Sequence, residues 1–215
     1  MRVGLFGGTF NPVHWGHLRA ADEIREMFSI KQVIFIPTNI SPHKESQIIV
    51  SAENRLKMLN YAVNSKPCFF TSDVELKRPG KSYSVETISH FKHIFGKEVT
   101  LFFILGIDAF LEIASWKNYE ELFTLCNFIV MSRPGYEVKK LDQVIPAQLK
   151  ENFRYQPDVK RFINNSKYSI YFIEITPVDI SSCSIRTRIK EGSSINHLLP
   201  EKVESYIKEH KLYRD

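Results

Sequence analysis

Apolar residues along the chain gather in short runs that alternate with stretches of helical periodicity. Residues 3–6, 32–38 and 99–105 are almost continuously apolar, which is typical of strands buried on both faces of a parallel sheet. Between these runs, apolar residues recur at spacings of three and four, as they do along one face of a helix. The clearest helical stretches are residues 18–28, 51–64, 84–95 and 201–210.

Shorter segments extend this pattern. Residues 127–132 and 168–176 predict two more strands, residues 70–76 a weaker one, and residues 109–116, 120–126 and 180–192 predict short helices. Because strand and helix alternate, we expect an α/β fold with a Rossmann-like doubly wound parallel sheet. We expect a single domain over residues 1–215, with a small helical part at about 180–215. Residues 136–167 have weak periodicity and predict an insertion of short helix and loop.

The segment after the first strand is the most informative part of the chain, and it reads Gly7-Gly8-Thr9-Phe10-Asn11-Pro12-Val13-His14-Trp15-Gly16-His17. Glycines let a phosphate approach the backbone and allow positive φ, and a helix start after them offers N–H groups to an anion. His14 and His17 share one face of the first helical turn. A glycine pair also occurs in ordinary tight turns, and paired histidines can be metal ligands or core residues, but no HExxH frame or Cys pair accompanies them. The combination favours phosphate binding.

A second candidate anion site lies at residues 180–186, which read Ile-Ser-Ser-Cys-Ser-Ile-Arg. Serines at a helix start present hydroxyl and N–H groups, and Arg186, about one turn later, adds a forked cation near Ser182. An ordinary serine cap is the alternative. Together with the first turn, this segment suits the two ends of one triphosphate.

Polar residues follow other expected strands, where open α/β sheets bind ligands. Asn39 and Lys44 supply an amide and a cation after residues 32–38, although a solvated loop would look similar. Asp108, just after Gly106, can accept hydrogen bonds from ribose hydroxyls or cap the next helix. Arg133 can fork onto a carboxylate or phosphate, or can simply be a surface arginine.

Two further segments are candidates for binding a ring and a carboxylate. An electron-poor pyridine ring would stack on the indole of Trp116, for which core packing is the alternative. The helix start at Ser84 and Thr87 can receive a carboxylate through its dipole, and a simple cap explains Ser84 equally well.

Composition narrows the class of partner. The net charge of +5 is compatible with attraction of small polyanions and equally with an ordinary, mildly basic soluble protein. No RNP-like aromatic run, zinc finger or arginine-rich arm points to nucleic acid. Cys68, Cys126 and Cys183 form no CxxC pair, which indicates a reducing compartment, with the cytoplasm as the default. No apolar run approaches the roughly 18 residues of a membrane span. The sequence does not reveal the oligomeric state.

The first turn resembles the GGTF(D/N)PxHxGH signature of the nucleotidylyltransferase superfamily and, within it, of the bacterial nicotinate-nucleotide adenylyltransferases. The similarity covers almost the whole chain. Residues 38–44, 82–87 and 180–186 resemble the PxNxPPHK, SYTxxT and ISSTxIR segments of that family, and GxD, PxW and RPG positions match as well. Ser41 replaces one of the prolines, and Cys183 replaces the usual threonine with its hydroxyl.

The resemblance implies roles for named residues. ATP would be bound by Gly7, Gly8, Thr9, Phe10, His14, His17, Gly106, Asp108, Ser182, Ile185 and Arg186. The mononucleotide would be bound by Asn39, Lys44, Ser84, Thr87, Trp116 and Arg133. Catalytic roles would fall to His14, His17, Lys44 and Arg186.

The expected reaction is direct displacement, because neither a GxSxG elbow nor a Walker lysine is present. The 5′-phosphate of nicotinate mononucleotide would attack the α-phosphorus of ATP, and pyrophosphate would leave in line. We expect Mg²⁺ as a cofactor held mainly by phosphates and water, with no metal site built from protein ligands alone. The alternatives are a transferase for phosphopantetheine or a cytidylyl substrate, a class I synthetase fragment, for which no KMSKS-like loop is seen, and a non-catalytic nucleotide-sensing module.

Overall fold

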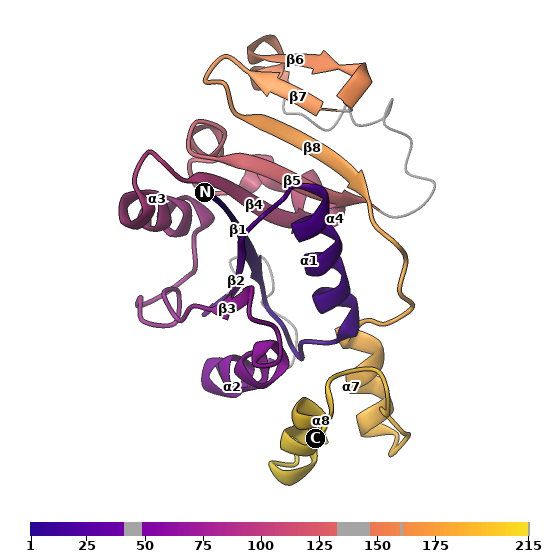
Figure 1. Cartoon of the computed structure of the whole chain (residues 1–215). Coiled ribbons are helices and arrows are strands. Elements are labelled where there is room, and N and C mark those ends of the chain that lie inside the picture. Colours follow the sequence, from indigo (N-terminus) through magenta and orange to yellow (C-terminus); the bar gives the residue numbers. More distant parts are fainter. Residues whose placement is uncertain (41–48, 133–146, 160, 215) are drawn as a thin grey trace.

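The computed structural model describes residues 1–40, 49–132, 147–159 and 161–214. Its centre is an eight-stranded sheet with the order β3-β2-β1-β4-β5-β8-β7-β6 (Figure 1). The strands are β1 (Arg2–Gly8), β2 (Gln32–Pro37), β3 (Phe69–Thr71), β4 (Thr100–Gly106), β5 (Asn127–Ser132), β6 (Phe153–Gln156), β7 (Arg161–Asn164) and β8 (Ser169–Glu174).

Six of these strands run parallel. The pairs β2–β3, β1–β2, β1–β4, β4–β5 and β5–β8 are all parallel, whereas β7 pairs antiparallel with both β6 and β8. The chain moves outward from β1 to β3 and then crosses back to β4 on the other side of β1. The point between β1 and β4 is therefore a topological switch point, where open α/β sheets bind ligands beyond the carboxyl ends of their strands.

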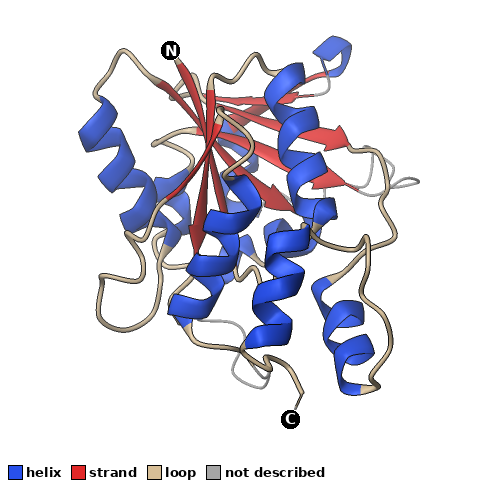
Figure 2. Cartoon of the chain, turned by 60° about the horizontal axis from the view of Figure 1, so that its bottom comes forward, coloured by secondary structure: helices blue, strands red, loops and turns tan. Residues whose placement is uncertain are grey.

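Helices cover both faces of the sheet (Figure 2). They are α1 (Trp15–Met27), α2 (Ala52–Val63), α3 (Ser84–Phe95), α4 (Ile107–Leu111), α5 (Tyr119–Leu122), α7 (Ser182–Lys190) and α8 (Glu201–Glu209), with 3₁₀ turns η1 (Ile113–Ser115), η2 (Ala147–Asn152) and η3 (Pro157–Val159). No helix within the described ranges is long and apolar enough to cross a membrane.

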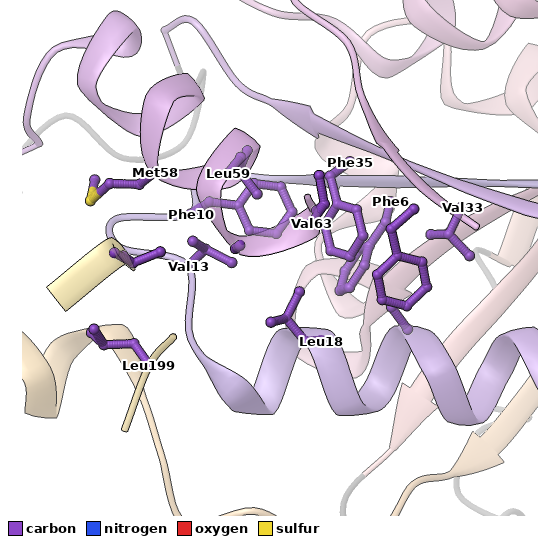
Figure 3. Packing of buried hydrophobic residues seen from close by; sticks show 14 of the residues in the cluster. Phe6, Phe10, Val13, Leu18, Val33, Phe35, Met58, Leu59, Val63 and Leu199 are labelled. Atoms are coloured by element: carbon purple, nitrogen blue, oxygen red, sulfur yellow. The ribbon is translucent and has the colours of Figure 1, made fainter. Parts of the chain in front are cut away.

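The alternation of side chains along each strand creates two hydrophobic cores. Leu5 points toward the core that includes α3 and α4, whereas Phe6 points toward the core under α1 and α2. In this second core, Phe6, Phe10 and Phe35 lie between the two helices (Figure 3). Both layers fix the carboxyl ends of the central strands, from which the site is built.

Local sequence explains where several helices begin and end. Ser51 accepts a hydrogen bond from the N–H of Asn54 at 3.3 Å at the start of α2, and Ser181 does the same for Ser184 at 3.0 Å at the start of α7, as N-cap residues do. Gly96, with φ of 69°, ends α3, because glycine adopts positive φ at little cost. Ser84 is not the cap of α3. That position is taken by Tyr83, which makes no side-chain cap bond.

The main differences from the sequence-based expectation lie at the edges of the sheet. The strand expected over residues 70–76 is only Phe69–Thr71, and turns follow it. The short helix expected in the insertion appears as η2 and η3, but the hairpin formed by β6 and β7 was not expected. The sheet is consequently mixed rather than wholly parallel.

Candidate active site

The loop between β1 and α1 lies at the switch point. Gly7 and Gly8 are the last two residues of β1, so positive φ is used not by them, as the sequence suggested, but by Phe10, with φ of 48°. A Cβ at Gly8 would lie 3.0 Å from the ring of Phe10. Gly8 is therefore required for the ring of Phe10 to fold back over the strand end.

His14 and His17 are brought together at the start of α1. Their ring centroids lie 3.8 Å apart, and the N–H of His14 donates to Nδ1 of His17 at 3.3 Å. The ring of Phe10 packs edge-on against His17, with centroids 5.1 Å apart. A Cβ at Gly16 would lie 3.0 Å from two atoms of the His14 ring. The motif therefore holds each imidazole by local packing.

Burial makes His14 a neutral imidazole at physiological pH. Its side chain is buried, and this burial lowers its pKa from 6.5 to about 4, because desolvation disfavours the charged form. Its Nδ1 atom is buried without a hydrogen-bond partner among the described residues. His17 is only half-buried.

Helix α7 docks directly on this loop. Ser182 Oγ donates to the carbonyl of Pro12 at 2.8 Å, and Arg186 Nη1 donates to the carbonyl of Asn11 at 2.9 Å. Ile185 contributes a fully buried side chain to the core below, so its side chain anchors the helix. The two anion-binding segments predicted from the sequence therefore converge on residues 11–17.

The loop after β2 is tied to the segment before α3. The N–H of Asn39 donates to Ser82 Oγ at 3.0 Å, and its side-chain amide donates to the carbonyl of Arg78 at 3.2 Å. Asn39 is thus held in place at the carboxyl edge of the sheet. Lys44 and Arg133, the cations predicted on either side of this edge, lie outside the described residues.

Thr87 lies beneath the expected carboxylate site. Its side chain is fully buried; its hydroxyl donates to Glu75 Oε1 at 2.7 Å and accepts a hydrogen bond from Arg78 Nη1 at 3.0 Å. Burial raises the pKa of Glu75. The Thr87 hydroxyl is therefore engaged in this network at the start of α3, which Ser84 opens, and the role of Thr87 in binding a carboxylate stays a prediction.

Trp116 and the start of α3 belong to one neighbourhood. Trp116 packs edge-on against Phe103, with ring centroids 6.4 Å apart, and is half-buried. The next residue, Lys117, forms an ion pair with Glu86 at 2.8 Å, and its ammonium lies 4.4 Å from the ring centroid of Tyr83. Through Lys117, the segment of Trp116 is therefore in contact with the start of α3, where the carboxylate is predicted to bind.

The end of β4 offers open space. A Cβ at Gly106 would meet nothing within 4 Å, and Asp108 is exposed in the first turn of α4. The end of β4 is therefore open next to Asp108, the residue predicted to bind the ribose. Thr9, another residue predicted to bind ATP, lies in the β1–α1 loop. It is half-buried, and its carbonyl accepts a hydrogen bond from Arg55 at 2.9 Å.

Sequence reasoning missed the residues that hold these loops from below. Arg55 is only 1% exposed, and Glu75 and Asn11 are buried as well. Asn11 Oδ1 accepts a hydrogen bond from the N–H of Val50 at 3.3 Å. One signal was available for Arg55, because it stands at helical spacing from Met58, Leu59 and Ala62 on the buried face of α2.

Comparison with known proteins defines the class. A family model described as cytidylyltransferase-like matches residues 5–188. A nicotinic acid mononucleotide adenylyltransferase from Plasmodium falciparum, solved in complex with NaAD, has the same fold, with a TM-score of 0.72 at 19% identity over 99% of this chain and 97% of that one. The fold and the histidine loop thus define a nucleotidyltransferase of the cytidylyltransferase-like class.

Relatives of higher identity give the particular family. The chain is 44% identical over 215 residues to a probable nicotinate-nucleotide adenylyltransferase of Geotalea daltonii, covering 100% of this chain and 99% of the relative. It is 45% identical over 214 residues to the corresponding protein of Geobacter sulfurreducens, covering 99% and 98%. The chain belongs to the nicotinate-nucleotide adenylyltransferase family.

Proposed function

We propose that the protein transfers the adenylyl group of ATP to nicotinate mononucleotide, giving nicotinate adenine dinucleotide and pyrophosphate in the biosynthesis of NAD. The observation that carries this proposal is the docking of Ser182 and Arg186 onto the loop that holds the two histidines. The two segments predicted to bind anions are in contact through these bonds, which supports binding of a single triphosphate by both.

The chemistry is an in-line displacement at the α-phosphorus of ATP. The phosphate oxygen of the mononucleotide forms the new P–O bond while the bond to pyrophosphate breaks. Such a reaction requires alignment of the two phosphates and stabilisation of the charge that develops between them. His17 stabilises the reacting phosphate, and Arg186 stabilises the departing pyrophosphate. The bond from Arg186 to the Asn11 carbonyl holds the guanidinium in place for this role.

The role of neutral His14 differs from that of His17. Because burial keeps its pKa at about 4, it binds phosphate oxygens as a neutral hydrogen-bond donor. ATP enters as its Mg²⁺ complex, with the ion held by phosphate oxygens and water. The described residues contain no group of three or more His, Cys, Asp or Glu that could hold a metal ion.

The mononucleotide occupies the other side of the switch point. Asn39 and Lys44 hold its phosphate, the start of α3 at Ser84 receives the nicotinate carboxylate, and Trp116 stacks on the pyridine ring. Arg133 supplies a second partner for the carboxylate. The reaction takes place in the cytoplasm, which suits three free cysteines.

A product assay with a panel of acceptors tests this function. Purified protein is incubated with Mg²⁺-ATP and nicotinate mononucleotide, nicotinamide mononucleotide or phosphopantetheine, and dinucleotide and pyrophosphate are both measured. We expect equimolar products with nicotinate mononucleotide and much slower turnover with the amide. Comparable rates with both pyridine mononucleotides would refute the acid preference, and ATP binding without pyrophosphate release would indicate a sensing module.

A further inference from the structure

Arg55 is a charged side chain buried beneath the site. It belongs to the first turn of α2 and is only 1% exposed. Burial lowers its pKa, yet an arginine remains protonated in proteins. Among the described residues no carboxylate lies within ion-pair distance of it, and its hydrogen bonds to described residues all go to backbone carbonyls.

These carbonyls belong to three different segments. Arg55 Nη1 donates to Thr9 at 2.9 Å and to Thr38 at 2.6 Å. Nη2 donates to Asn39 at 3.2 Å, and Nε donates to Val50 at 3.1 Å. One planar group thus joins the β1–α1 loop, the residues that directly follow β2, and Val50, two residues before the start of α2.

Among the described residues Glu75 acts on Arg55 only at longer range, and a buried cation without a close ion pair adds little to stability compared with an apolar side chain of similar size. The hydrogen bonds of Arg55 instead suit a role in positioning the backbone, because the rigid fork of a guanidinium fixes the positions of several acceptors at once. Under the proposed function, the β1–α1 loop binds ATP and the loop after β2 binds the mononucleotide. Arg55 donates hydrogen bonds to both loops.

We propose that Arg55 is a positioning residue that sets the distance between the ATP loop and the mononucleotide loop, and thereby aligns the two reacting phosphates. This inference rests on the proposed function. Misplacement of reactants by about 1 Å can cost on the order of 10²-fold in rate, even when each is still bound. Loss of Arg55 therefore lowers turnover more than the affinity for either nucleotide alone.

The variant Arg55→Lys tests this separation. A lysine keeps the charge but offers one ammonium group, which cannot span the same carbonyls. We expect kcat to fall by roughly 30- to 100-fold, while the dissociation constants of nicotinate mononucleotide and of a non-hydrolysable ATP analogue, each measured alone, change by no more than about threefold.

Met58→Ala is the matched control. Met58 lies on the same helix and is fully buried, packed in the core shown in Figure 3, and its side chain has no N–H or O–H group to hold a loop. We expect a lower melting temperature with kcat within about threefold of wild type, at a temperature where both variants are folded. The proposal is overturned if Arg55→Lys keeps the kcat of wild type, or if its activity falls only because the dissociation constants of the nucleotides rise. It is also overturned if the kcat of Arg55→Lys equals that of Met58→Ala.

A measurement on the wild type keeps the proposal testable even if the lysine variant fails to fold. The N–H of Thr38 bonds to the Gly8 carbonyl at 3.0 Å, and the N–H of Val50 bonds to Asn11 Oδ1 at 3.3 Å. If Arg55 joins these segments, both amides exchange with solvent through one opening of equal free energy. Independent openings would contradict the proposal. A wild-type protein without dinucleotide synthesis would count against the proposed function instead.

Discussion

At the scale of single residues, the two imidazoles at the start of α1 differ because their surroundings differ. His14 is buried and neutral, whereas His17 is half-buried and packs against Phe10. Two groups of the same type in different environments commonly take different roles at one site. Under the proposed function, the buried ring would bind phosphate without charge, and the more exposed ring would contact the reacting phosphate.

The substitution His17→Ala tests the second role. Because it removes one preorganised donor from the transition state, we expect kcat to fall about 10²- to 10³-fold, measured as dinucleotide formed at saturating ATP. The control is His93→Ala, which removes an exposed histidine from α3 and should leave kcat unchanged. Wild-type turnover in the His17 variant would remove this residue from the mechanism.

The depressed pKa of His14 predicts a pH dependence of stability. The folded state takes up the proton near pH 4, whereas the unfolded chain does so near pH 6.5, so the unfolded state binds more protons between these values. Stability is therefore highest above pH 6.5 and falls as the pH drops toward 4, by roughly 3 kcal/mol from this residue.

Urea titrations across this range, for wild type and His14→Gln, isolate the contribution of His14. The variant lacks the titrating group and should lose less stability between pH 6.5 and 4, while the other acidic and basic groups affect both proteins equally. Parallel curves for the two proteins would show that His14 titrates normally in the folded state.

The sequence predicted which residues of the first loop and of α7 come together, because these residues belong to short motifs whose spacing determines their local arrangement. The spacing of His14 and His17 on one helical turn is an example. Arg55 and Glu75 were missed since their partners, the Thr9 and Thr38 carbonyls and Thr87, lie far from them in sequence. Likewise, nothing in the sequence indicated that the hydroxyl of Thr87, a predicted substrate-binding residue, is hydrogen-bonded to Glu75 and Arg78.

At the scale of elements, the docking of α7 on the β1–α1 loop is the contact on which the proposed triphosphate site depends. Arg186→Met removes the bond to the Asn11 carbonyl and a cation near the triphosphate. We expect kcat/KM for ATP to fall about 10²-fold and the free energy of unfolding to fall by about 1–3 kcal/mol.

Arg188→Met provides the comparison on the same helix. Arg188 is exposed and contacts only the carbonyl of Ser194, at 3.4 Å, among the hydrogen bonds seen in the described chain. This variant should match wild type in kcat/KM, with a change in stability within about 0.5 kcal/mol. Equal losses in both variants would indicate a general charge effect and not a specific site.

The central strands β1, β2 and β4 were predictable because each contains a nearly continuous apolar run, as in Thr100–Gly106. The hairpin of β6 and β7 was not, since each strand has only four residues and its pairing depends on the edge of β8. Helix α2 lies within the helical stretch predicted over residues 51–64, but the burial of the charged Arg55 on its inner face was not predicted.

At the scale of the whole molecule, topology explains why residues far apart in sequence form one site. Parallel strands β1, β2 and β4 end at the same edge of the sheet, and the order of connections reverses between β1 and β4. The chain then returns through α7, whose first residues contact the loop after β1. The site is thus complete only when the first and last thirds of the chain meet.

The most direct test of this account is a crystal structure of the protein with Mg²⁺ and α,β-methylene-ATP. The account predicts one triphosphate that lies within hydrogen-bond distance of both the His17 imidazole and the Arg186 guanidinium, with the ribose near Asp108. A triphosphate that contacts only one of these two segments, or that binds elsewhere on the sheet, would contradict it.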